Sequence, residues 1–297
     1  MPTPDSVAEV REALARVDYL ADEPAALVSF LAQRLGKPVL VEGPAGVGKT
    51  ELAKALSRAT GRDLIRLQCY EGLDEAKALY EWNYRKQLLR IQTEAREAGW
   101  EDVKEDIFGE DFLLPRPLLT GIASEEPVVL LIDEIDKTDQ EFEAMLLEVL
   151  SDFQISIPEL GVIEASSHPL VLLTSNNSRE LTEALKRRCL YLWLDYPNVE
   201  RELEIVRLHA PELSETMARK LVEVVHMVRG LDLKKPPSIA ESIDWARALL
   251  MLGADDIDGS VFERTMSIIV KHRTDLDVVA ERVGVKLNDG VLGKLTG

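Results

Sequence analysis

The stretch Gly-Pro-Ala-Gly-Val-Gly-Lys-Thr at residues 43–50 constrains the fold of this chain more than any other feature. It fits G-x-x-x-x-G-K-[ST], in which glycines let backbone N–H groups surround phosphate oxygens, the lysine adds positive charge and the last hydroxyl can bind Mg²⁺. A mostly apolar run at residues 38–42 precedes it, and residues 51–58 have helical apolar spacing. A strand, a loop and a helix in this order place a phosphate at a helix N-terminus. A glycine-rich turn that binds no ligand is the alternative interpretation.

Four further apolar runs predict strands in the first two thirds of the chain. They lie at residues 64–69, 127–134, 168–176 and 190–195, with helical segments between them. Strands that are apolar on both faces are typical of a parallel sheet covered by helices and joined by right-handed crossovers. We therefore expect an α/β fold with a five-stranded parallel sheet sandwiched by helices.

The apolar pattern changes after Pro197, beyond which no strand-like run remains. We expect a nucleotide-binding α/β core at residues 1–198, a small all-α lid domain at 199–283 and a C-terminal tail at 284–297. The helices of the lid are predicted at residues 199–209, 213–229, 239–252 and 260–273. The core is predicted to contain a helical insertion at about 74–98, irregular chain at 99–121 and a hairpin at about 153–165.

Composition narrows the classes of partner and compartment. The net charge is −18, from 35 basic and 53 acidic residues, which disfavours nucleic acid and anionic membranes as partners. No leader sequence and no run long enough to span a membrane is visible, so we expect a cytoplasmic protein with no membrane-spanning segment. Cys69 and Cys189 are interpreted as buried free thiols, and the four histidines have no metal-ligand spacing.

Three polar residues at the ends of predicted strands are candidates for metal binding and for activation of water beside the loop. Asp133 closes a buried strand, and we expect it to be the second protein ligand of Mg²⁺, on the strand next to that of the loop. Glu134 would orient and polarise the attacking water, and Asn176 would hold that water or the γ-phosphate. The alternatives are a polar strand end for the two acids and a turn or helix cap for the asparagine.

Together, residues 43–50, 130–136 and 174–176 resemble the Walker A, Walker B and sensor 1 motifs of AAA+ ATPases. The hairpin predicted before sensor 1 resembles the insertion of the MoxR branch. Closer similarity is to CoxD-like MoxR proteins, which are associated with maturation of molybdenum-containing carbon monoxide dehydrogenase; the resemblance covers nearly the whole chain except about its last dozen residues. The stretches that carry this similarity are residues 66–73, 80–84, 146–154, 184–189 and 243–246.

The resemblance implies a P-loop AAA+ core that hydrolyses ATP with Mg²⁺ in a homo-oligomeric ring, usually a hexamer. An arginine of the adjacent subunit would reach the γ-phosphate, and by position this is Arg188, with Arg187 as second choice. Surface charges at a helix C-terminus are the alternative for both. The expected partners are a metalloenzyme client and a companion with a von Willebrand factor A domain. The ATP site is expected to comprise Gly43, Pro44, Ala45, Gly46, Val47, Gly48, Lys49, Thr50 and Glu51, with Thr50 and Asp133 on the metal.

One element departs from the MoxR pattern. Where the family carries a sensor 2 arginine, this chain has Glu241, and Arg247 lies nearly two turns further on. An ATP-binding assembly scaffold with little turnover is therefore an alternative function, and a DNA-directed motor is another, which the negative charge disfavours. The aromatic residues at positions 70, 80, 82 and 84 either face a substrate or pack against the sheet.

Overall fold

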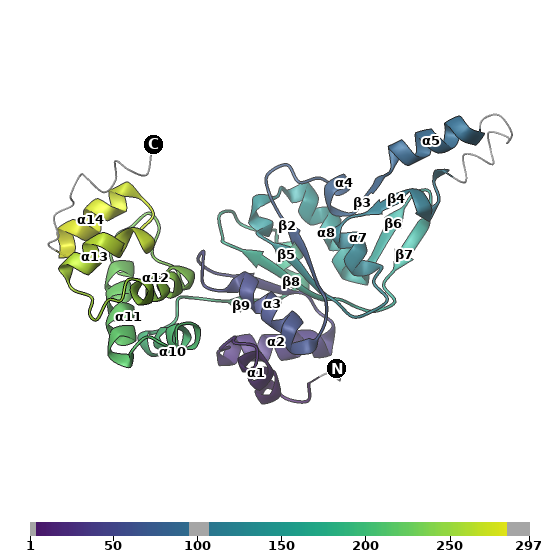
Figure 1. The fold of residues 1–297 in the computed structure, drawn as a ribbon. Helices are drawn as coiled ribbons and strands as arrows, with labels where there is room; N and C mark the ends of the chain where they lie inside the picture. Colours follow the sequence, from purple (N-terminus) through teal and green to yellow (C-terminus); the bar gives the residue numbers. More distant parts are fainter. Residues whose placement is uncertain (1–3, 95–106, 284–297) are drawn as a thin grey trace. The chain divides into compact units, whose positions relative to one another are not determined.

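The computed structural model describes residues 4–94 and 107–283 (Figure 1). Contacts divide the chain into two units, the first comprising Met1–Pro44 and Gly48–Leu194, and the second Ala45–Val47 and Asp195–Gly297. The domain limits expected from the sequence, at 198 and 283, stay predictions. No helix among the described residues is both long and apolar enough to cross a membrane.

The first unit contains the expected five-stranded parallel sheet flanked by helices (Figure 1). Its strands lie in the order β2-β5-β8-β1-β9. Their bounds are β1 Val39–Glu42, β2 Leu64–Gln68, β5 Val129–Asp133, β8 Leu170–Ser175 and β9 Leu190–Trp193. Since the last residues Glu42 and Ser175 are paired, as are Gln68 and Asp133, the residues that follow the strands gather at one edge of the sheet.

The order of these strands corrects one expectation. β8 lies between β1 and β5, so the strand that ends in Asp133 is not next to the strand of the loop. The strand between them is the one that leads into Asn176. Alternating strand and helix patterns predict which segments form the sheet, but the contacts between crossover helices and the sheet decide the order of the strands.

Helices cover the sheet because most of them bury an apolar stripe against it, while the first helix packs on two of the others. β1, β5 and β8 are buried along their whole length, as their continuous apolar sequences predict. Burying one such Leu, Ile or Val side chain stabilises the fold by about 1.5–3 kcal/mol. Outside the insertion, the helices of this unit are α1 Val7–Ala15, α2 Glu23–Leu35, α3 Lys49–Thr60, α7 Pro117–Ile122, α8 Gln140–Asp152 and α9 Glu183–Arg188, with the short 3₁₀ turn η2 Ile135–Lys137.

The helix expected over residues 74–98, with a break near Asn83 as the alternative, is interrupted by a strand just before Asn83. The chain forms α4 Glu75–Ala78, then strand β3 Tyr80–Trp82, then α5 Tyr84–Glu94, while residues 95–98 lie outside the described part. β3 pairs antiparallel with β4 Leu113–Pro115, which local periodicity cannot reveal because the partner is some thirty residues away. The segment predicted to be irregular, as far as it is described, contains η1 Glu110–Phe112, β4 and α7.

The aromatic residues of this insertion divide between the two interpretations. Trp82 is buried and makes edge contacts with Tyr80 and Phe108, at ring centroid distances of 6.2 and 5.3 Å. Tyr70 and Tyr84 are exposed. A separate antiparallel hairpin, β6 Gln154–Ile157 and β7 Gly161–Glu164, lies in the range where the sequence predicts one.

The second unit is helical in its described residues. Its helices are α10 Val199–His209, α11 Glu215–Arg229, α12 Ile239–Met251, α13 Gly259–Thr265 and α14 Arg273–Val283, with the 3₁₀ turn η3 Met266–Ile268. The helix expected over 260–273 is therefore wrong beyond Thr265, and α14 was not expected as a separate helix. Met266, Ile269 and Val270 enter the core from η3 and the residues after it, rather than from one helical face.

A buried polar cluster joins three helices of this unit. The carboxylate of Glu202 (α10) is fully buried and accepts two hydrogen bonds from Arg229 (α11), at 2.8 and 3.0 Å. It also contacts the His226 ring at 2.8 Å and accepts a 2.6 Å bond from the Ser242 hydroxyl (α12). The Arg229 guanidinium lies 4.3 Å from the Tyr196 ring centroid. The Glu202 carboxylate is thus surrounded by donors that are fixed in the core.

Candidate functional site

The loop between β1 and α3 has backbone conformations that its glycines permit. Gly43 and Gly48 have φ angles of 151° and 97°. A Cβ atom at Gly43 would lie 1.9 Å from the carbonyl oxygen of Leu194, so no other residue fits there. Gly48 is the N-cap of α3 and provides no side chain to cap it. The first N–H groups of α3 are therefore left for an anion, which the positive end of the helix dipole also attracts.

Lys49 lies inside this loop and is almost entirely buried. Its ammonium donates hydrogen bonds to the carbonyl oxygens of Gly43 and Pro44, both at 2.7 Å, and to Oδ1 of Asn176 at 2.8 Å. Burial lowers the pKa of Lys49, and the nearby carboxylates of Asp136, Asp133 and Glu134 oppose that shift. The cation is thus held by neutral oxygens, with no carboxylate bonded to it, and can exchange them for phosphate oxygens.

Asp133 and Thr50 form the second part of the site. Thr50 Oγ1 lies 3.0 Å from Asp133 Oδ1, so a hydroxyl on α3 and a carboxylate at the end of β5 face each other. Mg²⁺ prefers such hard oxygen ligands and completes its octahedron with water and phosphate oxygens. The two residues therefore present oxygen atoms of the kind that Mg²⁺ takes as ligands.

Glu134 follows Asp133 in a left-handed conformation, with φ of 59°. Its backbone N–H donates to the Thr174 hydroxyl at 2.9 Å. Its carboxylate accepts hydrogen bonds from the amides of Gln68 (β2), at 3.1 Å, and Asn176, at 3.2 Å. A non-glycine residue with positive φ stores strain that persists where surrounding contacts impose it, often at functional sites. Here the turn directs the Glu134 carboxylate toward Asn176 and Lys49.

Asp136 fixes the loop that carries Asn176. Its carboxylate accepts from the backbone N–H groups of Asn176 and Ser178, at 3.2 and 3.0 Å, and from the Ser178 hydroxyl at 2.5 Å. Burial raises the pKa of Asp136, but the combined hydrogen bonds from Ser178 and Asn176 outweigh it and hold the pKa below its usual value. Asn176 therefore lies between Lys49 and Glu134 in a fixed position.

The structure brings five residues chosen from the sequence into one cluster. They are Lys49, Thr50, Asp133, Glu134 and Asn176. Two others, Arg187 and Arg188, are exposed at the C-terminus of α9 and bond to none of the five. The Glu51 side chain, on the first turn of α3, forms ion pairs with Arg58 at 2.8 Å and with Lys54 at 3.5 Å.

Sequence reasoning assigned no role to three residues that contact this cluster. Arg66 and Gln68 come from the same face of β2 and reach Asp133 and Glu134, respectively, while Thr174 donates to Asp133 at 2.5 Å. A signal was present: Arg66 and Gln68 are polar residues at alternate positions of an otherwise mostly apolar strand, which lies at the end of the strand order. That pattern shows which face they share but not what they meet.

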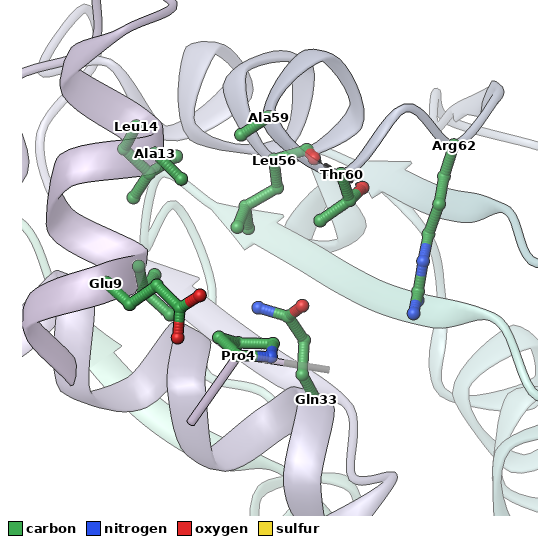
Figure 2. A pocket seen from close by; sticks show the side chains of 10 residues that line it. Pro4, Glu9, Ala13, Leu14, Gln33, Leu56, Ala59, Thr60 and Arg62 are labelled. Atoms are coloured by element: carbon green, nitrogen blue, oxygen red, sulfur yellow. Dashed lines mark hydrogen bonds between the residues drawn. The ribbon is translucent and has the colours of Figure 1, made fainter. Parts of the chain in front are cut away.

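Cys69 and Cys189 are free thiols, and burial raises the pKa of each to about 12. Neither is therefore a nucleophile at neutral pH. A separate cavity of about 80 Å³ lies among α1, α2 and the C-terminal part of α3, lined by residues such as Glu9, Gln33 and Arg62 (Figure 2). It contains none of the residues of the cluster described above, so it is no part of that site.

In the second unit, Glu241 has a local structural role. Its carboxylate accepts a hydrogen bond from the Ser238 N–H at 2.7 Å, and the Ser238 hydroxyl accepts from the Glu241 N–H at 3.3 Å. This capping box begins α12. Arg247, the substitute considered for an arginine at that place, is exposed on the same helix. Helix capping thus accounts for a glutamate at position 241.

Comparison with known proteins identifies the family to which the chain is similar. The family model described as AAA domain (dynein-related subfamily) matches residues 38–189. The gas vesicle ATPase GvpN1 of Halobacterium salinarum is 24% identical over 204 residues, which are 66% of this chain and 57% of that protein. GvpN of Haloferax mediterranei is 24% identical over 236 residues, 76% of this chain and 65% of its own length. This chain therefore spans less than two thirds of the length of either relative.

Solved structures support the fold alone. Two mutant RuvB structures from Thermotoga maritima superpose with TM-scores of 0.51 and 0.52, at 19% and 18% sequence identity. Both comparisons cover 96% of this chain, and 87% and 86% of the respective RuvB chains.

Proposed function

We propose, since this chain belongs to the family of AAA domains (dynein-related subfamily), that it binds ATP with Mg²⁺ and hydrolyses it. One observation carries the proposal. A continuous series of hydrogen bonds runs from Lys49 through Asn176 to Glu134, directly beside the facing oxygens of Thr50 and Asp133. Lys49 can thus bind a γ-phosphate, Thr50 and Asp133 can hold a metal ion beside it, and Glu134 can act as the base.

Each residue has a role that follows from its contacts. Lys49 and the N–H groups of the loop bind the phosphates, and Thr50 with Asp133 would hold Mg²⁺, which neutralises charge on the phosphate oxygens when bound. Glu134 accepts a proton from the attacking water. Asn176, fixed by Asp136, bonds to Glu134 and positions it relative to Lys49. CoxD-like activity and ring assembly are finer proposals, taken up below.

ATP binding tests this proposal most directly. Lys49→Ala should abolish binding of a fluorescent ATP analogue measured by anisotropy with Mg²⁺, because the buried cation that neutralises phosphate is removed. Lys54→Ala is the matched control, since Lys54 lies on the same helix, is partly exposed and pairs with Glu51. Equal affinity of Lys49→Ala and wild type would contradict the assignment of the loop.

The ring is proposed on the family resemblance and on the exposure of Arg187 and Arg188 at the end of α9. An arginine that acts on a neighbour's γ-phosphate makes turnover per subunit rise with protein concentration, with a hexamer expected by light scattering. Arg188→Ala should reduce turnover by about 10³-fold. Mixing it with Glu134→Gln subunits should restore part of the activity, because an intact arginine and an intact base then meet at some interfaces. No restoration, with Arg187→Ala behaving as wild type, would exclude an action in trans.

The proposed client is a partner protein that this ATPase remodels or matures. Resemblance to CoxD-like proteins favours a molybdenum-containing hydroxylase such as carbon monoxide dehydrogenase, with a companion carrying a von Willebrand factor A domain. The expected compartment is the cytoplasm. Glu134→Gln with ATP should retain the client, and mass spectrometry of the retained proteins should identify a metalloenzyme. Recovery of nucleic acid alone would contradict this client class, which the charge of −18 also disfavours.

An assembly scaffold with little turnover is the second candidate, favoured by Glu241 in place of a sensor 2 arginine. It predicts ATP-dependent assembly with the same low turnover in wild type and Glu134→Gln. A large difference in turnover between those two proteins would decide for the ATPase.

A further inference from the structure

Five donor contacts from three residues engage the carboxylate of Asp133, and one of these residues is charged. Oδ1 accepts from the hydroxyls of Thr50 and Thr174, at 3.0 and 2.5 Å. Oδ2 accepts from Nε and an NH₂ group of Arg66, at 3.1 and 2.6 Å, and lies 3.2 Å from the Thr50 hydroxyl. The negative charge of Asp133 is therefore balanced by a guanidinium of this chain itself.

The guanidinium reaches Asp133 from the solvent side. Asp133 is 3% exposed in its side chain, whereas the Arg66 side chain is 45% exposed. Arg66 is on β2, which runs beside β5 and pairs Gln68 with Asp133, so its side chain extends along the sheet edge to the carboxylate. Arg66 can leave Oδ2 by a change of side-chain rotamer, without displacing a buried residue.

We infer that Arg66 competes with the divalent metal for Asp133 and so restricts metal binding to the nucleotide complex; the inference rests on the proposed function. A carboxylate oxygen that accepts two hydrogen bonds from a guanidinium has its charge and its lone pairs engaged. A divalent cation at Thr50 and Asp133 is also repelled by the arginine beside it. Phosphate oxygens add the ligands and negative charge that compensate for both effects, so metal binds strongly together with nucleotide and weakly alone. Arg66 is thus a positioning residue, and its action is on the metal affinity.

The affinity for a metal ion without nucleotide tests this inference. Replacing a residue with a merely structural role would not raise that affinity. Mn²⁺ is a suitable probe because it takes the same oxygen ligands as Mg²⁺ and its free concentration is measured by electron paramagnetic resonance. In the full chain, Arg66→Gln should bind Mn²⁺ about tenfold more tightly than wild type, since the competing charge is removed. Arg66→Lys should lie between them because it keeps the positive charge but lacks the planar fork that donates two bonds to Oδ2. Adding Asp133→Asn to Arg66→Gln should abolish the gain.

Arg62→Gln is the matched control, because it removes the same charge just before β2 and Arg62 lies in the separate cavity of Figure 2. It should leave the Mn²⁺ affinity unchanged. Equal or weaker Mn²⁺ binding by both Arg66→Gln and Arg66→Lys would overturn the inference, and so would an equal gain in Arg62→Gln. Anisotropy of the ATP analogue distinguishes the two failures. If wild type does not bind it with Mg²⁺, the proposed function fails; if it binds normally and Arg66 variants do not alter Mn²⁺ affinity, the inference alone fails.

Discussion

Two clusters around acidic side chains differ in how the negative charge is balanced; Glu202 and Asp133 are buried, and Glu134 is half-buried. In the second unit, Glu202 is bound by Arg229, whose side chain is only 9% exposed, and by His226 and Ser242 from neighbouring helices. At the sheet edge of the first unit, Glu134 is bound by two neutral amides, and Asp133 by two hydroxyls and the half-exposed Arg66.

The difference teaches how a structural cluster is distinguished from a functional one. Arg229 and Ser242 are held by packing around Glu202, and removing Arg229 would leave a buried negative charge without its counter-charge. At the sheet edge, the amides of Gln68 and Asn176 are neutral and Arg66 is partly exposed, so these partners can be exchanged for a phosphate, a metal or water. Replacing one glutamate of each cluster by glutamine should therefore affect different properties, namely ATP turnover for Glu134 and stability for Glu202.

The largest effect is expected from Glu134→Gln. Removing the proton acceptor while keeping the shape of the side chain should lower the ATP turnover number by about 10²–10⁴-fold. ATP binding and the unfolding midpoint should remain near those of wild type, because amides can still surround the residue. A coupled phosphate-release assay measures turnover, and Glu141→Gln, an exposed glutamate on α8, is the control. Normal turnover in Glu134→Gln would show that another group is the base.

Glu202→Gln should destabilise the second unit by about 3–5 kcal/mol, because it leaves the buried Arg229 guanidinium without its carboxylate. Urea unfolding of the full chain followed by circular dichroism measures the free energy. Glu204→Gln, two residues later on α10, changes an exposed ion pair with Arg201 and should cost at most about 1 kcal/mol. If both variants were equally stable, the partners of Glu202 would be as exchangeable as those of the acids at the sheet edge.

Asp136 combines features of the two clusters, since it is buried but holds a loop of the site. Asp136→Asn should lower the free energy of unfolding by about 1–3 kcal/mol at neutral pH, because hydrogen bonds to a charged acceptor are lost. The pKa of Asp136 is lowered in the fold. Its contribution is therefore present above the unfolded pKa, about 3.9, and is lost as the pH falls through the folded value. Urea unfolding at several pH values should show the gap between variant and wild type closing below about pH 4. A gap independent of pH, or one equally large in the exposed control Asp63→Asn, would contradict this account.

The smallest effect concerns the N-termini of α3 and α12, which are closed in different ways. α12 is closed by the capping box of Ser238 and Glu241, whereas α3 begins at Gly48 without a side-chain cap. Ser238→Ala should reduce the free energy of unfolding by about 1 kcal/mol, since one backbone N–H loses its acceptor. Thermal unfolding of the full chain measures the shift. The absence of any loss would mean that the cap of α12 is as dispensable for stability as an uncapped phosphate-binding terminus.

Local sequence patterns predicted much of the fold and of the site. Glycines at positions 43 and 48 with Lys49 and Thr50 specify a loop at a helix N-terminus, because φ angles and donor groups depend on the residues themselves. Five apolar runs specify the strands of the sheet, of which β1, β5 and β8 are buried along their whole length. The acids at the end of one run specify the sheet edge where they lie. Local capping also begins α1 and α2, where the side chains of Ser6 and Asp22 each accept a backbone N–H.

Only the tertiary structure decided which of these parts meet. It placed β8 between β1 and β5, so that Asn176 lies between Lys49 and Glu134, and it brought Arg66 and Gln68 of β2 onto the two acids. It also placed residues 80–82 of a predicted helical segment in β3, whose partner β4 is distant in the sequence. The physical reason is common to these cases: backbone preference and periodicity act over a few residues, whereas strand order and side-chain pairing depend on packing between segments far apart in the chain.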